Sequence, residues 1–96
     1  MRNCKFSKQA DKDIENIHEY TYINFGQKQA RKYSENLFNK IQSIVKNEIS
    51  GRKVNYIKQG IRKQEVGSHI VLYKEHISSI LIVRVLHKSM DTKRHI

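Results

Sequence analysis

The spacing of apolar residues changes once along this 96-residue chain, and that change constrains the fold more than any other feature. Up to about residue 45, apolar side chains recur at three- and four-residue steps, which is the period of a helix surface. From about residue 60 they follow the alternation and short apolar runs that are typical of β-strands. We therefore expect an α+β fold in which helices precede most of the sheet.

The first half predicts a short strand followed by two helices. Residues 2–6 alternate, and Ser7 lies where an N-cap hydroxyl would accept a hydrogen bond from the first helical turn. Gly26 offers the left-handed conformation that ends a helix, and so short a joint makes the two helices antiparallel. The predicted apolar faces are Ala10, Ile14, Ile17 and Thr21 in the first helix, and Ala30, Tyr33, Leu37, Ile41 and Ile44, flanked by Phe38 and Val45, in the second.

The second half predicts a meander of three strands over residues 60–66, 69–74 and 79–87, after a turn at Ser50–Lys53. Residues 70–73 and 80–83 are apolar on both faces, which suits interior strands covered by the helices on one side and partly shielded on the other. The element order is βααβββ, with an N-terminal helical hairpin packed on an antiparallel sheet. Residues 1–96 form a single domain, since no linker or repeat divides them.

Charge and cysteine content narrow the classes of function. Nineteen Lys and Arg against nine Asp and Glu give a net charge of +10, of which residues 49–96 carry +7. Such a balance indicates an anionic partner, either nucleic acid, an acidic protein segment or a membrane surface. The lone Cys4 excludes a disulfide scaffold and a four-ligand zinc ribbon, and no signal peptide or membrane-spanning run is present. We expect a cytoplasmic protein that does not enter membranes.

Several separated motifs resemble one known family. They are Gly60-Ile61-Arg62, Gly67-Ser68-His69-Ile70-Val71-Leu72-Tyr73, and Arg84-Val85-Leu86-His87-Lys88-Ser89-Met90-Asp91, together with Phe25-Gly26, Gln29-Ala30 and Tyr33. In this order and spacing they are similar to the ParE toxins of the RelE/ParE superfamily.

The resemblance implies a bacterial toxin of a type II toxin-antitoxin system that inhibits DNA gyrase by binding. It implies a cognate, ParD-like antitoxin with an acidic, partly disordered segment that folds across the toxin. A hetero-oligomer with that antitoxin is possible, and contact with nucleic acid would be indirect.

Two arginines are candidates for a cationic binding platform. Arg84 alternates with Ile82 and Leu86, so its guanidinium is expected on an otherwise apolar face, where it needs a partner. That partner is either a carboxylate of this chain, Asp91 or Glu65, or an external anion. Arg62 on the first strand of the meander has the same two interpretations.

His87 carries the alternative, enzymatic hypothesis. Its near-neutral titration suits a general acid or base, and superfamily relatives that cleave messenger RNA on the ribosome use basic residues with a His or Tyr near this strand end. Arg62, Arg84 and His87 could form such a catalytic set. The competing interpretation is a histidine fixed by hydrogen bonds in a structural role.

The remaining candidates also have two interpretations. The aromatic set of Tyr20, Tyr22, Phe25, Tyr33 and Phe38 indicates core or hairpin packing more than base stacking. His69 is expected to be half-buried and hydrogen-bonded, and the histidine spacing does not indicate a metal site or any cofactor. The basic tail around Met90 is either a frayed terminus or a surface for which target and antitoxin compete.

We therefore expect a toxin that acts by binding, through Arg62, Arg84, His87, Lys88, Met90 and Asp91, with no catalytic residue and no metal. The rival hypothesis is a ribosome-dependent endonuclease of the RelE type. A degenerate toxin retained for autoregulation would produce no growth arrest.

Overall fold

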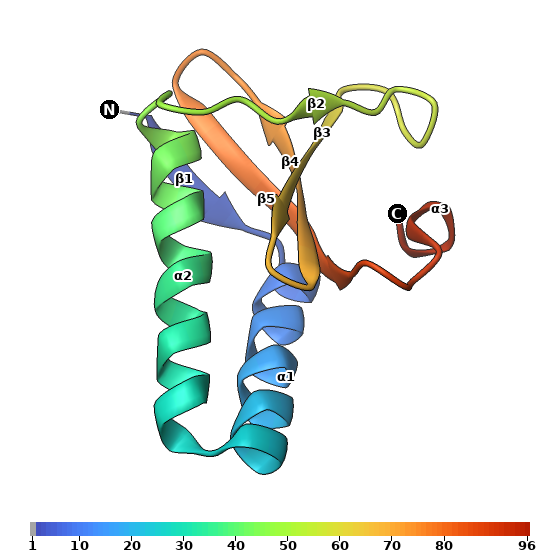
Figure 1. The fold of residues 1–96 in the computed structure, drawn as a ribbon. Helices are drawn as coiled ribbons and strands as arrows, with labels where there is room; N and C mark the ends of the chain where they lie inside the picture. Colours follow the sequence, from blue (N-terminus) through green and yellow to red (C-terminus); the bar gives the residue numbers. More distant parts are fainter. Residues whose placement is uncertain (1) are drawn as a thin grey trace.

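Two long helices cover one face of a five-stranded sheet in the computed structural model, which describes residues 2–96 (Figure 1). The sheet order is β1-β5-β4-β3-β2. The helical hairpin projects beyond the end of the sheet, so part of each helix has no strand beneath it (Figure 1). The elements are β1 (Asn3–Phe6), α1 (Lys8–Phe25), α2 (Gln27–Val45), β2 (Arg52–Lys53), β3 (Ile61–Val66), β4 (His69–Glu75), β5 (Ser79–His87) and α3 (Thr92–His95).

The expected α+β class and the order βααβββ are confirmed, with two short additions. Arg52–Lys53 was expected within a turn but forms strand β2 against β3, and Thr92–His95 forms the terminal helix α3. The sheet is mixed, because β1 pairs parallel with β5 while the other strand pairs are antiparallel. The expected antiparallel meander of β3, β4 and β5 is confirmed, whereas the parallel strand β1 departs from the antiparallel sheet that was expected. The connection from β1 to β5 runs through the helical hairpin and strands β2 to β4, and it is long enough to return the chain beside β1 in the parallel sense.

Local capping explains where the helices begin and end. The Ser7 hydroxyl accepts a hydrogen bond from the amide of Ala10 at 2.9 Å, which satisfies one of the free amides of the first turn. Gly26 separates the two helices with φ of 90°, a conformation that costs other residues more than glycine. The predicted helical hairpin thus forms at the predicted joint.

Apolar side chains pack on both faces of the sheet. Between the helices and the sheet, Leu37 and Ile41 of α2 pack in one cluster with Tyr73. Tyr73 is completely buried, and its hydroxyl accepts a hydrogen bond from the Gly51 amide at 2.7 Å. The opposite face carries a smaller cluster of Val54, Ile61, Ile70, Leu72 and Leu86.

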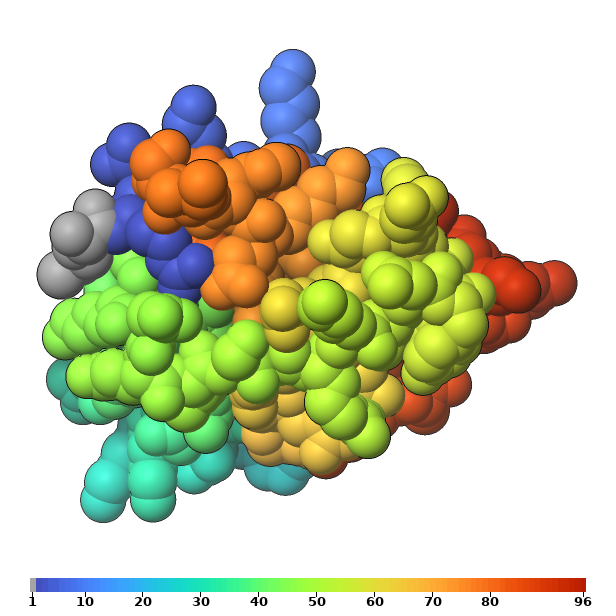
Figure 2. Space-filling model, turned by 90° about the horizontal axis from the view of Figure 1, so that it is seen from above, coloured from blue at the N-terminus to red at the C-terminus, as the bar shows by residue number. Residues whose placement is uncertain are grey.

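The loop after β2 and the C-terminus shield this second cluster. Ile57 and Ile96 pack against it, and both segments lie at the same end of the molecule (Figure 2). The predicted partial shielding of the second face is confirmed. Within residues 2–96, no helix is long and apolar enough to cross a membrane.

Candidate partner-binding groove

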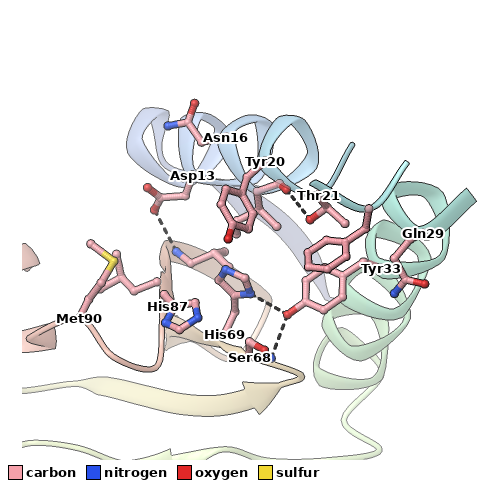
Figure 3. Close-up of a pocket in the computed structure, with 14 residues that line it drawn as sticks. Asp13, Asn16, Tyr20, Thr21, Gln29, Tyr33, Ser68, His69, His87 and Met90 are labelled. Carbon is pink, nitrogen blue, oxygen red and sulfur yellow. Dashed lines mark hydrogen bonds between the residues drawn. The ribbon is translucent and has the colours of Figure 1, made fainter. Parts of the chain in front are cut away.

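A groove of about 620 Å³ opens where the helical hairpin extends past the sheet (Figure 3). One wall is formed by α1 and the start of α2. The other wall is formed by the start of β4, the end of β5 and the segment that follows β5. The lining residues are Asp13, Asn16, Ile17, Tyr20, Thr21, Phe25, Gln29, Tyr33, Ser68, His69, Val85, Leu86, His87 and Met90. Half of these side chains are apolar, Tyr or Phe, and apolar atoms form most of the exposed groove surface, which is typical of a binding site.

The hairpin presents large apolar side chains to solvent. Tyr20, Ile23 and Phe25 are 63%, 69% and 66% exposed, and Tyr22 and Phe38 are also exposed. This aromatic set was expected to pack in the core or within the hairpin. Its members lie outside the core, and Tyr33 alone of the five is half-buried. An exposed apolar surface of this kind marks a site of interaction with another molecule.

Tyr33, His69 and His87 form the polar end of the groove (Figure 3). The Tyr33 hydroxyl lies 2.6 Å from His69 Nδ1 and accepts a hydrogen bond from the Ser68 amide at 3.0 Å. The imidazole rings of His69 and His87 meet edge to face with centroids 5.2 Å apart. Burial, and secondly the charge of His87, lower the pKa of His69. His69 is thus half-buried and hydrogen-bonded, as expected.

A glycine permits the close approach of Tyr33 to the β3–β4 turn. Gly67 has φ of 54°, and a Cβ at this position would lie 2.8 Å from the Tyr33 ring. A side chain here would strain the backbone and displace Tyr33 from His69.

Arg84 is held by α1 and not by the carboxylates that we expected. Its Nε and Nη2 donate to the carboxylate of Asp13 at 2.8 and 2.9 Å, and its Nη1 donates to the carbonyl oxygen of His95 at 2.9 Å. The side chains of Arg84 and Asp13 are 14% and 13% exposed. The hydrogen bond to Asp13 raises the pKa of Arg84. The expected pairing with Asp91 or Glu65 is therefore wrong.

A register shift explains this position of Arg84. The pairing of β4 with β5 is irregular at Leu72/Tyr73, so the simple alternation along β5 is broken and Arg84 lies opposite Leu72. Beyond Ile82 the outer edge of β5 has no strand neighbour, and Asp13 occupies part of that edge by accepting the Val85 amide at 3.0 Å. The Arg84 guanidinium then donates two hydrogen bonds to the same Asp13 carboxylate.

Arg62 is also paired within the chain, but at a different place. Its Nε lies 3.1 Å from Glu75, which also binds Arg2 at 2.7 Å, and its Nη1 donates to the Gly51 carbonyl at 2.8 Å. In the sheet register Arg62 lies opposite Tyr73, whereas His87 lies opposite His69. At about 3.3 Å per residue, the separation of Tyr73 from His69 along β4 places Arg62 and His87 roughly 13 Å apart in the strand direction.

The structure therefore does not bring Arg62, Arg84 and His87 together as one set with free functional groups. His87 alone of the three is exposed, at the end of β5, where its Nδ1 accepts a hydrogen bond from the Ser89 amide at 3.1 Å. Within residues 2–96, no group of three or more His, Cys, Asp or Glu could hold a metal ion.

The other predicted site residues follow β5. Met90 lines the groove and is 38% exposed. Lys88 is exposed and lies 3.7 Å from Glu65, while Asp91 caps α3 by accepting a hydrogen bond from the Lys93 amide at 3.2 Å. His87 and Met90 thus belong to the groove, whereas Lys88 and Asp91 lie beside it.

Sequence reasoning missed most of the groove wall. Asp13, Tyr20, Phe25 and His69 were not predicted as site residues, although α1 and β4 place them there. Helix length gave no signal, because helices of 18 and 19 residues, about 27–29 Å long, do not exceed a nine-residue strand of about 30 Å. The overhang arises from where the hairpin lies relative to the sheet, which no local pattern specifies.

Comparison with known proteins assigns the chain to a family. A family model described as the ParE toxin of type II toxin-antitoxin systems, parDE, matches residues 4–92. Toxin ParE1 of Caulobacter vibrioides is 30% identical over 96 residues, covering 100% of this chain and 99% of that protein. This chain belongs to the ParE toxin family. The resemblance seen in the sequence motifs is thereby confirmed.

Further ParE relatives and solved structures agree with this family and fold. Toxin ParE1 of Mycobacterium tuberculosis is 35% identical over 91 residues, covering 94% of this chain and 93% of that protein. The chromosomal ParDE toxin-antitoxin system of P. aeruginosa contains a chain with a TM-score of 0.76 at 19% identity, covering 91% of this chain and 96% of that one. A chain of the E. coli DinJ-YafQ complex has a TM-score of 0.70 at 16% identity, covering 91% and 93%. The ParE-type α+β fold is therefore shown for this toxin.

Proposed function

We propose that this ParE toxin arrests growth by binding DNA gyrase, and that a cognate ParD-like antitoxin neutralises it by occupying the groove. The observation that carries the proposal is the groove itself, a largely apolar cavity of about 620 Å³ flanked by exposed aromatic side chains. Burial of such side chains is a main source of binding energy in protein complexes.

The arrangement of the candidate catalytic residues favours binding over chemistry. Arg84 and Arg62 are both engaged by carboxylates of this chain, so neither guanidinium is free to neutralise a phosphate without breaking an ion pair. A single exposed His87 supplies one proton-transfer group without the basic cluster that cleavage of messenger RNA requires.

Charge and shape support an acidic antitoxin segment as the occupant of the groove. The net charge of +10 favours an acidic partner, and the groove suits the apolar side of a segment that folds on binding. The solved relatives of similar fold are themselves toxin-antitoxin systems, ParDE and DinJ-YafQ. Met90 lines this groove, which supports the proposal that target and antitoxin compete for it.

The decisive experiment compares two targets with one purified protein. We expect the free toxin to inhibit DNA supercoiling by gyrase and to leave messenger RNA intact in a translation reaction. Cleaved messenger with unchanged supercoiling would overturn the gyrase proposal in favour of the RelE-type endonuclease. No effect in either assay and no growth arrest on expression would indicate a degenerate toxin.

The role of the groove is tested by a matched pair of aromatic variants. Phe25→Ser removes an exposed ring that lines the groove, and Tyr56→Ser removes one that is 74% exposed but lies outside it. We expect Phe25→Ser to weaken binding of the antitoxin encoded by the neighbouring reading frame by about tenfold or more, and Tyr56→Ser to leave it nearly unchanged. Equal effects of the two variants would argue against the groove as the antitoxin site.

A further inference from the structure

His69 and His87 form a cross-strand pair whose outer nitrogen atoms are unused. They are opposite each other in the register of β4 and β5, and their Nδ1 atoms are engaged by Tyr33 and Ser89 respectively. Within residues 2–96, neither Nε2 atom has a hydrogen-bond partner. Among the described residues that are not exposed, no buried side-chain nitrogen or oxygen lacks a partner, so His69 Nε2 is in contact with solvent. His87 is an exposed residue, and both residues line the groove.

A hydrogen bond from the backbone fixes the tautomer of His87. The Ser89 amide donates to His87 Nδ1 at 3.1 Å, so the proton of a neutral His87 lies on Nε2. The Tyr33 hydroxyl lies 2.6 Å from His69 Nδ1 and 3.3 Å from the Val66 carbonyl, and either acceptor suits its one proton. Once His69 is protonated, its Nε2 also carries a proton, and the groove then contains two adjacent N–H donors without an acceptor.

The other residues of the groove indicate which class of ligand can accept hydrogen bonds from the two histidines. No Lys or Arg lines it among the described residues, and its one charged side chain, Asp13, is already bound by Arg84. A nucleic acid backbone would need several cations beside its phosphates. A second copy of this chain is disfavoured by a net charge of +10. A carboxylate on an otherwise apolar protein segment fits both the donors and the walls.

We propose that His69 and His87 together bind a carboxylate of the antitoxin segment, and that this contact takes up a proton. The inference rests on the proposed occupation of the groove by the antitoxin. A carboxylate between the rings stabilises an imidazolium, because an opposite charge favours the protonated form. The binding equilibrium then shifts in favour of the complex as the pH falls.

The charged and titratable groups around the pair permit this coupling. From the helices, Asp13, Tyr20 and Tyr33 line the same groove, and Asp13 is neutralised by Arg84. On the sheet side, Lys88 and Glu65 form an exposed ion pair next to His87. In the free toxin, burial and the charge of His87 lower the pKa of His69, and a bound carboxylate opposes this effect, so that His69 takes up a proton from solvent on binding.

A small probe tests the carboxylate site without an antitoxin. Benzoate combines an apolar ring with a carboxylate, and benzamide is its neutral analogue. We expect benzoate to shift the NMR signals of the His69 and His87 rings, but not those of the exposed His76, and to bind about tenfold more weakly at pH 8 than at pH 6. Benzamide should bind more weakly than benzoate and without pH dependence. Equal binding of the two compounds, or no binding of benzoate, overturns the proposal.

Variants and calorimetry connect the site to the antitoxin. His87→Gln alters an exposed side chain, so the fold should survive, while His69→Gln also removes the contact with Tyr33. We expect proton uptake on antitoxin binding, measured in phosphate and Tris buffers, to disappear in His87→Gln and to persist in the control His76→Gln. Persistence of the uptake in both histidine-pair variants overturns the proposal. Failure of the antitoxin to bind at all, with benzoate still bound, contradicts instead the proposed function of the groove.

Discussion

At the scale of single residues, exposure separates the charged side chains that hold the fold from those available to a partner. Arg84 and Asp13 are mostly buried and are joined by two hydrogen bonds at the edge of β5. Asp13 also accepts from the Val85 amide, and Arg84 donates to the His95 carbonyl. Lys88 and Glu65 are 45% and 55% exposed at 3.7 Å. A pair withdrawn from water depends on its partner, whereas an exposed pair exchanges its contact for water at little cost. The first pair is therefore structural, although Arg84 had the sequence features of a binding residue.

Replacing Asp13 should destabilise the toxin strongly. Asp13→Ala leaves the Nε and Nη2 groups of Arg84 and the Val85 amide without an acceptor in a poorly hydrated place, and we expect a loss of about 2–4 kcal/mol in the free energy of unfolding. Glu65→Ala is the matched control, with an expected change of about 0.5 kcal/mol or less. Urea unfolding followed by circular dichroism measures both. Similar small losses in the two variants would mean that the Arg84 pair is dispensable, and that Arg84 is free to bind a partner.

The lowered pKa of His69 predicts a loss of stability in weak acid. The unfolded chain binds a proton at the ordinary value of about 6.5, whereas the folded chain binds it at a lower pH. Between these values the unfolded state carries more protons, so stability rises with pH there. The contribution is present above about pH 6.5 and is lost as the pH falls through the lowered native value.

The measurement is the urea midpoint of the free toxin between about pH 8 and pH 5. We expect a steeper decline in the unmodified protein than in His69→Gln, which cannot titrate at this position. Parallel curves for the two proteins would show that His69 titrates in the folded state as it does in the unfolded chain.

At the scale of secondary structure, the sequence predicted elements better than their lateral arrangement. Ser7, Gly26 and the helical period located the hairpin because caps and periodicity are local properties. The parallel pairing of β1 with β5 and the irregularity at Leu72/Tyr73 depend on contacts between distant segments. The Asp13–Arg84 pair joins residues 71 positions apart, and no local pattern specifies such a partner. The groove was missed for the same reason, since it arises from the overhang of one layer past another.

The C-terminal helix α3 should act as a cover for the second face of the sheet. Ile96 packs against the cluster that contains Leu72 and Leu86, and the His95 carbonyl accepts from Arg84. Deleting residues 92–96 removes one hydrogen bond and part of an apolar contact, so we expect a loss of about 1–2 kcal/mol in unfolding free energy with the fold retained. Chemical unfolding measures the stability of the truncated protein, and a growth-arrest assay measures its function. Arrest abolished in a truncated but folded protein would assign the tail a direct role in binding the target.

At the scale of the whole molecule, positive charge and apolar groove have separate roles in association. The chain carries +10, but no Lys or Arg lines the groove among the described residues. Charges outside a contact accelerate the encounter of opposite partners, while contacts inside it determine how long the complex lasts. An acidic antitoxin, as proposed above, would therefore be captured quickly and held by apolar contacts.

Salt should therefore slow association of toxin and antitoxin far more than it speeds dissociation. Raising the salt from about 50 to about 500 mM shortens the Debye length to a few ångströms, and we expect the association rate constant to fall by about tenfold or more. The dissociation rate constant should change by less than about threefold, because burial of Phe25 and its neighbours is not screened by ions. Stopped-flow mixing and surface-based kinetics measure the two constants. If the dissociation rate carried most of the salt dependence, ion pairs within the interface, and not its apolar contacts, would hold the complex together.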